Sequence, residues 1–239
     1  MLLTVFFLFS CRSITFIDEE LSRPDAAVYF SFDDGPNPYD DTTARVLDVL
    51  ARYGIRAFFS LLGENAAHAP ELVRRIHDEG HYIVNHGYSN KLAHNMNDEE
   101  FRINLLKGEA AITAALGKEL HPRLYRPHGG LYSPGQEEIW REAGYTMLPS
   151  NIRIYDSRFN EKDNEKAIRR VIKKVEQERQ GIVLLHDGLG SYQRMEKRLK
   201  KNPRGIFNRS WIPGALEEII NRLLEKGFIL NGPELFPIP

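Results

Sequence analysis

The sequence has almost no cysteine and no excess of charge of either sign. Cys11 is the single cysteine among 239 residues, so a disulfide within the chain is impossible. The 32 basic and 33 acidic side chains leave a formal net charge of −1. We therefore expect no nucleic-acid partner, although a local basic patch is compatible with this balance. Internal repeats and low-complexity linkers are also absent, and the length suits one large domain.

A long hydrophobic run is missing as well. Residues 1–10 are almost wholly apolar, but a helix needs about 20 such residues to span a bilayer. The stretch fits the apolar core of a signal peptide, about 7–15 residues long, although the usual basic residues before it are lacking. Leu8 to Cys11 resembles a bacterial lipoprotein cleavage site with an atypical Phe9. We expect a signal peptide or lipoprotein leader at 1–11 and a tether at 12–25, with export to the cell envelope and lipid attachment at Cys11; a buried N-terminal strand is the alternative.

From residue 27 onward, short apolar strands alternate with helical patterns. Continuously apolar strands are typical of a parallel sheet covered on both faces. About seven βα units favour a closed barrel over an open doubly wound sheet, and no Gly-x-Gly-x-x-Gly follows the first strand to indicate dinucleotide binding. We predict a single α/β domain over residues 26–239. Its expected strands are 27–32, 57–62, 81–86, 124–127, 145–148, 182–187 and 228–230, with helices near 42–54, 72–80, 97–117, 133–144, 165–180 and 215–226.

Polar side chains stand at the ends of four of these strands. They are Asp33, Asp34, His86, Arg126, His186 and Asp187. Because the carboxyl ends of parallel strands meet on one face of a barrel, we expect these side chains to lie close together. Adjacent carboxylates repel each other unless a metal ion, an arginine or a shared proton compensates. Singly, each residue has a plainer interpretation, such as an Asx turn, a hydrogen-bonded histidine or a surface cation, but these do not explain the joint occurrence.

These residue types suit metal-assisted hydrolysis of an acyl bond. A carboxylate and an imidazole from neighbouring strands make a plausible site for a divalent ion such as zinc. The second carboxylate would be free to activate a water molecule whose pKa the ion lowers. Arg126 could keep that carboxylate ionised and oriented, and His186 could protonate a leaving amine or alkoxide.

Four segments carry a family resemblance. They are Ser31–Pro36, Gly80–Asn90, Tyr125–Gly130 and Ile182–Asp187. In this order they resemble the motifs of the polysaccharide deacetylase family, also called the NodB-homology domain or carbohydrate esterase family 4, over about residues 26–230. The resemblance implies a deformed (β/α)7 barrel and metal-dependent removal of acetyl groups from N-acetylated glycans or O-acetylated xylan.

The resemblance also implies roles for individual residues. Asp33 would be the catalytic base, with Arg126 orienting it. His186 would be the general acid, and Asp156 would occupy the carboxylate position that tunes it. A serine replaces the tryptophan expected after this carboxylate, so the acetyl pocket is expected to be lined differently.

The metal site implied by the resemblance is altered. Asp34 and His86 match two ligands, but Asn90 stands where the family has a second histidine. An amide oxygen is uncharged and a poorer zinc ligand than imidazole, so we expect Asn90 to bind more weakly or to favour a harder ion. Zinc is the first expectation, with cobalt, manganese or nickel as alternatives. His94 could substitute for Asn90 if its loop folded back.

The remaining implied positions concern the substrate. The backbone N–H of Gly129 would stabilise the oxyanion, and Leu184 would lie beside the acetyl methyl group. His128 replaces a proline of the third motif and could bind substrate or merely fill space. The segment 191–210 is strongly basic and is either a solvated surface helix with a loop, or a lid or groove wall that attracts an anionic glycan or a membrane surface.

Together these features predict a monomeric N-deacetylase acting on a GlcNAc- or MurNAc-containing polysaccharide, with peptidoglycan first. An acetyl xylan esterase is the close alternative. A non-catalytic glycan-binding protein that has lost its metal is the alternative from another class, and Asn90 favours it. Retention of Asp33, Arg126 and His186 opposes it, because a binding protein needs neither a base nor an acid.

Overall fold

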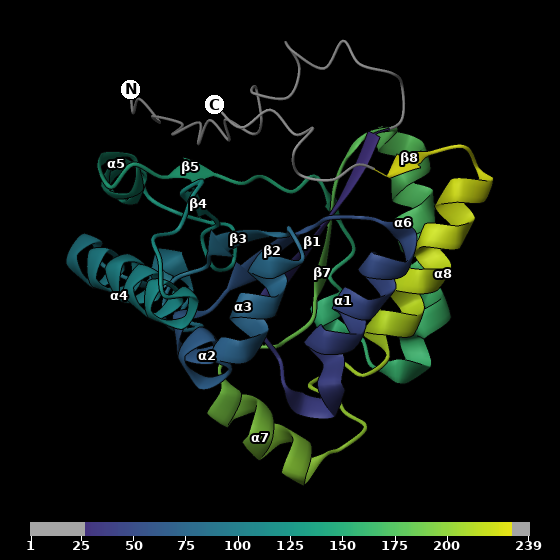
Figure 1. Cartoon of the computed structure of the whole chain (residues 1–239), viewed down its shortest axis with the longest axis horizontal. Helices are drawn as coiled ribbons and strands as arrows, with labels where there is room; N and C mark the ends of the chain where they lie inside the picture. Colours follow the sequence, from purple (N-terminus) through teal and green to yellow (C-terminus); the bar gives the residue numbers. More distant parts are fainter. Residues whose placement is uncertain (1–26, 231–239) are drawn as a thin grey trace, which may run out of the picture.

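The computed structural model describes residues 27–230 of the chain, in which eight parallel strands form one curled sheet (Figure 1). The strand order is β5-β4-β3-β2-β1-β7-β6, and β8 pairs with the start of β1. Within the described residues, β5 and β6 do not pair, so the barrel stays open between them. The predicted deformed (β/α)7 barrel in a single α/β domain is confirmed, while the predicted leader and tether lie outside the described residues.

The strands are β1 Ala27–Gly35, β2 Phe58–Leu61, β3 Tyr82–Asn85, β4 Leu124–Tyr125, β5 Thr146–Met147, β6 Ile152–Arg153, β7 Gly181–His186 and β8 Ile229–Leu230. The helices are α1 Thr42–Tyr53, α2 Gly63–His68, α3 Pro70–Asp78, α4 Asp98–Leu116, α5 Pro134–Glu142, α6 Asn164–Glu178, α7 Tyr192–Lys201 and α8 Ile212–Glu225. Short 3-10 turns lie at Tyr39–Asp41, Ala93–Asn95, Asp156–Arg158 and Glu161–Asp163. None of the helices within 27–230 is long and apolar enough to span a membrane.

All seven predicted strands are present, β6 and α2 are additions, and α7 lies in segment 191–210, where a surface helix is one of two interpretations. β6 has two residues, too few for an apolar pattern to show. The α2 sequence, Gly63–His68, lacks the apolar repeat of an amphipathic helix. Prolines follow β4 and β5 at Pro127 and Pro149, and because proline cannot donate to a strand ladder, both strands end early on this side of the sheet.

Strand β1 is the centre of the sheet and sets the direction of the residues at its end. Val28, Phe30 and Phe32 pack into the main core with α1, α6 and α8, which lie together on one face of the sheet (Figure 1). Burying each of these side chains is worth about 1.5–3 kcal/mol. Because successive side chains of a strand point to opposite faces, Ser31 and Asp33 are turned to the inside of the barrel. The hydrophobic pattern of β1 therefore directs the side chain of Asp33 to the inside of the barrel.

A second core supports the other end of the sheet. Phe101 of α4 and Trp140 of α5 pack against Tyr125 of β4. The α4 helix begins with a capping box in which Asn97 and Glu100 satisfy each other's free backbone N–H groups. This packing holds the segment after β4, which carries Arg126 and His128, against the rest of the barrel.

Candidate active site

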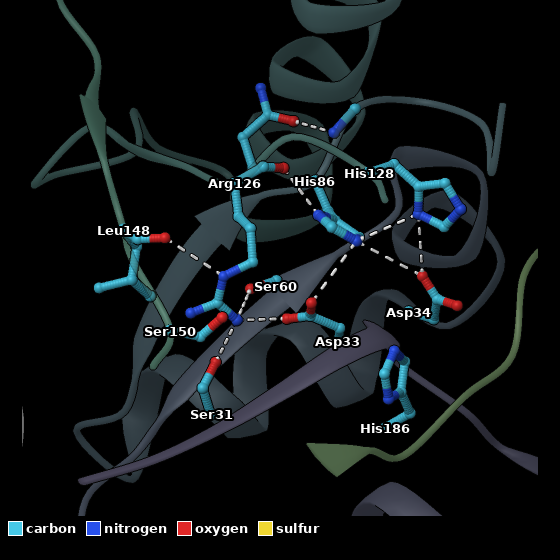
Figure 2. A network of polar contacts seen from close by, with 12 residues as sticks. Ser31, Asp33, Asp34, Ser60, His86, Arg126, His128, Leu148, Ser150 and His186 are labelled. Atoms are coloured by element: carbon cyan, nitrogen blue, oxygen red, sulfur yellow. Dashed lines mark hydrogen bonds and ion pairs between the residues drawn. The ribbon is translucent and has the colours of Figure 1, made fainter. Parts of the chain in front are cut away.

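Five of the six polar residues at the strand ends converge, as the sequence predicts, whereas the carboxylate of the sixth, Asp187, accepts a hydrogen bond from Thr43 of α1. Asp33 and Asp34 are in β1, His86 and Arg126 directly follow β3 and β4, and His186 ends β7. Figure 2 shows these side chains around one point at the carboxyl ends of the strands. All five residues are buried or mostly buried.

Arg126 holds Asp33 in place. Its Nη1 donates to Asp33 Oδ1 at 2.5 Å, to Ser31 Oγ at 2.5 Å and to Ser60 Oγ at 3.2 Å. Its other nitrogens donate to backbone carbonyls just after β5. Burial opposes ionisation of Asp33, but the charge of Arg126, together with His86, His186 and the hydroxyl of Ser60, outweighs it and keeps the pKa of Asp33 below its usual 3.8. Asp33 is therefore an oriented, ionised carboxylate at neutral pH.

Asp34 faces two imidazoles instead. Its Oδ1 lies 3.5 Å from His86 Nε2 and 3.3 Å from His128 Nδ1, and these two nitrogens are 3.2 Å apart (Figure 2). The backbone φ of Asp34 is 68°, a strained value for a residue with a side chain, and such strain clusters at functional sites. Asp34 Oδ1 is buried and accepts no well-aligned hydrogen bond from the described residues. One carboxylate oxygen and two imidazole nitrogens are suitable ligands for a divalent transition metal, so Asp34, His86 and His128 could hold one.

The protonation of His86 suits a ligand. Its Nδ1 lies 2.7 Å from the carbonyl oxygen of Arg126, so this nitrogen carries the proton and donates it. The lone pair of Nε2 is then directed at Asp34 and His128. Burial lowers the pKa of His86 despite the attraction of the nearby carboxylates, which favours the neutral ring. A backbone carbonyl that fixes the histidine tautomer is the usual support of a metal-binding imidazole.

His186 has its own carboxylate partner. Its Nδ1 lies 2.8 Å from Asp156 Oδ1, and its backbone N–H donates to Asp156 Oδ2 at 2.9 Å. Burial alone would lower the pKa of His186, but Asp156, together with the charges of Asp34 and Asp33, outweighs it and raises the pKa to about 9. The ring is therefore a cation at neutral pH and has a proton to give.

Arg209 is a residue that sequence reasoning did not assign to the site. Its side chain is fully buried and donates through Nη2 to Asp156 Oδ2, through Nη1 to the carbonyl oxygen of Asp156 at 3.1 Å, and through Nε to the carbonyl oxygen of His186 at 3.1 Å. It belongs to the basic segment 191–210. No local pattern distinguishes a buried arginine from its exposed neighbours, so only the contacts identify it.

The rest of the basic segment is a surface helix and a loop. Helix α7 lies beside α2 (Figure 1), and Tyr192 stacks on Tyr39 with ring centroids 5.0 Å apart. The basic residues of α7 and its following loop are exposed, namely Arg194, Lys197, Arg198, Lys200, Lys201 and Arg204. Of the two interpretations of this segment, the solvated helix describes α7, whereas Arg209 fits neither.

The other predicted site residues lie around the cluster. The amide of Asn90 is next to Gly190, whose N–H donates to Asp34 Oδ2 at 3.0 Å. Gly129 has a φ of 83° and directly follows His128. Leu184 is two residues before His186 and so shares its face of β7. His94 is exposed in a 3-10 turn and is not part of the cluster.

Known proteins resemble the chain in sequence. The family model for polysaccharide deacetylase matches residues 21–148. A peptidoglycan-N-acetylglucosamine deacetylase of Bacillus cereus is 39% identical over 131 residues, which cover 55% of this chain and 46% of that protein. The chain thus spans less than half the length of this relative. A chitooligosaccharide deacetylase of Bradyrhizobium sp. is 30% identical over 214 residues, with 89% of each protein covered.

Solved structures agree with the sequence comparison. A peptidoglycan N-acetylglucosamine deacetylase in complex with an N-oxidanyl-benzamide compound superimposes with a TM-score of 0.70 at 27% identity, covering 89% of this chain and 88% of that one. A family 4 acetyl xylan esterase from Clostridium thermocellum in complex with a cobalt ion gives a TM-score of 0.67 at 25% identity, covering 87% and 88%. Because the family model matches more than half of the chain and a relative aligns along nearly its whole length, the chain belongs to the polysaccharide deacetylase family.

Proposed function

We propose that the protein is a metal-dependent hydrolase that removes N-acetyl groups from GlcNAc- or MurNAc-containing polysaccharide, with peptidoglycan as the first substrate. The observation that carries this proposal is that the two adjacent carboxylates have different partners. Asp33 is paired with Arg126, and Asp34 faces imidazole nitrogens. One carboxylate is thereby free to act as a base while the other is placed to bind a cation. The names of the relatives, which are deacetylases of peptidoglycan and chitooligosaccharide, support the substrate class.

Asp33 would take the proton from the attacking water. Its low pKa keeps it ionised, and Arg126 fixes the carboxylate so that only one oxygen is used by the guanidinium. Asp34 and His86 would hold a divalent cation, with zinc first and cobalt, manganese or nickel as alternatives. Such an ion supplies Lewis acidity, which lowers the pKa of water and polarises an acyl oxygen.

His186 would protonate the leaving amine. Asp156 lies behind its Nδ1 and stabilises the imidazolium form, which leaves Nε2 as the proton donor. Gly129 is proposed to direct its N–H at the developing oxyanion, and Leu184 to contact the acetyl methyl group. An oxyanion donor of this kind is typically worth about 2.7–4 kcal/mol of barrier lowering.

Acetate release tests the proposal. Purified protein would be incubated with N-acetylglucosamine oligomers, with peptidoglycan and with acetylated xylan, after removal of metal and after readdition of zinc, cobalt, manganese or nickel. We expect metal-dependent acetate from the N-acetylated glycans. Release from xylan alone would replace the amidase by the esterase alternative. No acetate from any substrate with any ion would leave the non-catalytic glycan-binding alternative.

We also propose export, with attachment through a lipidated Cys11. The support is the apolar stretch 1–10 before Cys11 and the location of the relatives' substrates in cell walls. Metabolic labelling with a radioactive fatty acid should mark the wild-type protein and not a Cys11→Ala variant. Labelling of both proteins, or of neither, would contradict a lipid anchor at this residue.

A further inference from the structure

The three atoms that face one another at Asp34 have the spacing of metal ligands. The edges of the triangle formed by Asp34 Oδ1, His86 Nε2 and His128 Nδ1 measure 3.2, 3.3 and 3.5 Å. Atoms bound at about 2.0–2.1 Å to a tetrahedral zinc ion are about 3.3–3.4 Å apart. An octahedral ion with similar bond lengths would draw its neighbouring ligands to about 3.0 Å. The triangle therefore fits a tetrahedral ion, with one position left for water or substrate.

Asn90 packs against the loop that follows β7. Its amide nitrogen packs so close to Gly190 that a Cβ added there would lie 2.5 Å from it. The N–H of Gly190 in turn occupies Asp34 Oδ2, the carboxylate oxygen that is not in the triangle. Asn90 thus contacts the residue that bonds Asp34 Oδ2, whereas His128 Nδ1 itself lies 3.3 Å from Asp34 Oδ1, which accepts no hydrogen bond from the described residues.

Contacts within the protein hold His128 in position. Its carbonyl oxygen accepts a hydrogen bond from Ala93 N–H at 3.1 Å, and its ring meets the ring of His86 edge to face at a centroid distance of 5.0 Å. Its side chain is only 16% exposed. A ligand that is placed in advance loses little conformational freedom when the ion binds, which favours affinity.

We propose that His128, through Nδ1, is the third protein ligand of the metal, in place of a histidine at position 90. The site would then take one ligand from the end of each of β1, β3 and β4. This inference rests on the metal dependence of the proposed function. It assigns His128 to the ion rather than to the substrate, and it leaves Asn90 as a neutral amide beside the site.

Direct metal binding tests the inference. Zinc would be titrated calorimetrically into metal-free wild type and into His128→Ala, His128→Asn, Asn90→Ala and His86→Ala variants, with circular dichroism to show that each is folded. We expect His128→Ala and His86→Ala each to lose about 100-fold or more in zinc affinity, and Asn90→Ala to stay within about 3-fold of wild type. Cobalt provides a second readout, because its visible absorption is much stronger in tetrahedral than in octahedral sites and should weaken in His128→Asn.

A ligand swap sharpens the test. Combining His128→Pro with Asn90→His restores the pattern of the family motifs and should recover zinc binding that His128→Pro alone has lost. Loss of affinity in Asn90→Ala with full affinity in His128→Ala would overturn the inference while leaving the proposed function intact. Zinc binding that depends on His128 without acetate release would overturn the proposed function and leave the inference standing. A wild-type protein that binds none of the ions would overturn both.

Discussion

Two histidines of the same site have opposite protonation, and the comparison shows how neighbours assign roles. His86 has a backbone carbonyl at Nδ1 and carboxylates no closer than 3.5 Å at Nε2, so burial dominates and its pKa falls. His186 has a carboxylate 2.8 Å from Nδ1, so attraction dominates and its pKa rises to about 9. The first ring is neutral and suited to a metal, and the second is charged and suited to proton donation. Burial opposes the cationic form of both rings, so the nearby carboxylates make the difference.

The largest effect is expected from removing the base between these two histidines. Asp33→Asn should lower kcat by about 10²–10⁴-fold, because the amide cannot accept the proton from water. Zinc affinity should change little, since Asp34, not Asp33, faces the imidazoles most closely. The checks are acetate release and metal content of the same preparation. Loss of the metal together with activity would mean that the roles of the two aspartates are reversed.

Removing the carboxylate partner of His186 should lower the pKa of His186, so that its protonation resembles that of His86. Wild-type activity should fall as the pH rises through about 9, because the raised pKa of His186 holds its proton up to that point. This decline at high pH is the basic limb of the activity profile. In Asp156→Asn the negative charge beside His186 is gone, so the basic limb should move to lower pH and kcat should drop by about 100-fold. A pH profile of kcat/KM for both proteins measures the shift. An unchanged limb would show that another group provides the acid.

Arg209 should influence the pKa of His186 through Asp156. Arg209→Gln removes the guanidinium partner of Asp156, so the carboxylate should attract the His186 imidazolium more strongly. The basic limb should then move to higher pH while kcat falls about 10-fold. Removing one partner of a buried ion pair also costs about 3–5 kcal/mol of stability. Arg209→Lys, which keeps the charge, should stay close to the wild-type limb. If both variants lose stability and neither moves the pH profile, Arg209 has only a structural role.

The smallest effect concerns Asp187, a buried carboxylate that forms no ion pair within residues 27–230. Its Oδ2 accepts from Thr43 Oγ1 at 2.5 Å, its Oδ1 has no partner among the described residues, and burial raises its pKa to about 7 from the usual 3.8. The folded state therefore keeps a proton that the unfolded chain loses. Its stabilising contribution is full below pH 3.8 and disappears as the pH rises through about 7.

Asp187→Asn tests that window. The amide cannot ionise, so the loss of stability between pH 4 and 7 should become shallower, and the variant should gain stability relative to wild type above pH 7. Thr43→Ser, which keeps the hydroxyl donor, is the control. Urea denaturation at several pH values measures the difference. If the stabilities of wild type and Asp187→Asn changed in parallel with pH, Asp187 would have an ordinary pKa.

Much of the fold is predictable from local patterns. The nine residues of β1 are all buried, and its alternation of core and inward residues places Asp33 without further information. Asp34, His86, Arg126 and His186 are recognisable because each stands where an apolar strand stops. Short elements such as β6 are not predictable, because two residues carry no period.

The sequence by itself determined the alternation of strands and helices, the family, and the set of polar residues at the strand ends. Only the tertiary structure decided which of them meet. Asn90 occupies the motif position of a ligand, yet His128, 38 positions further on, lies with Asp34 and His86, because β4 pairs with β3 and sets the following residues beside the proposed metal site. Arg209 reaches Asp156 for the same kind of reason. Local periodicity reports which way a side chain faces, but distances between strands, and the protonation that depends on them, arise only when the sheet is assembled.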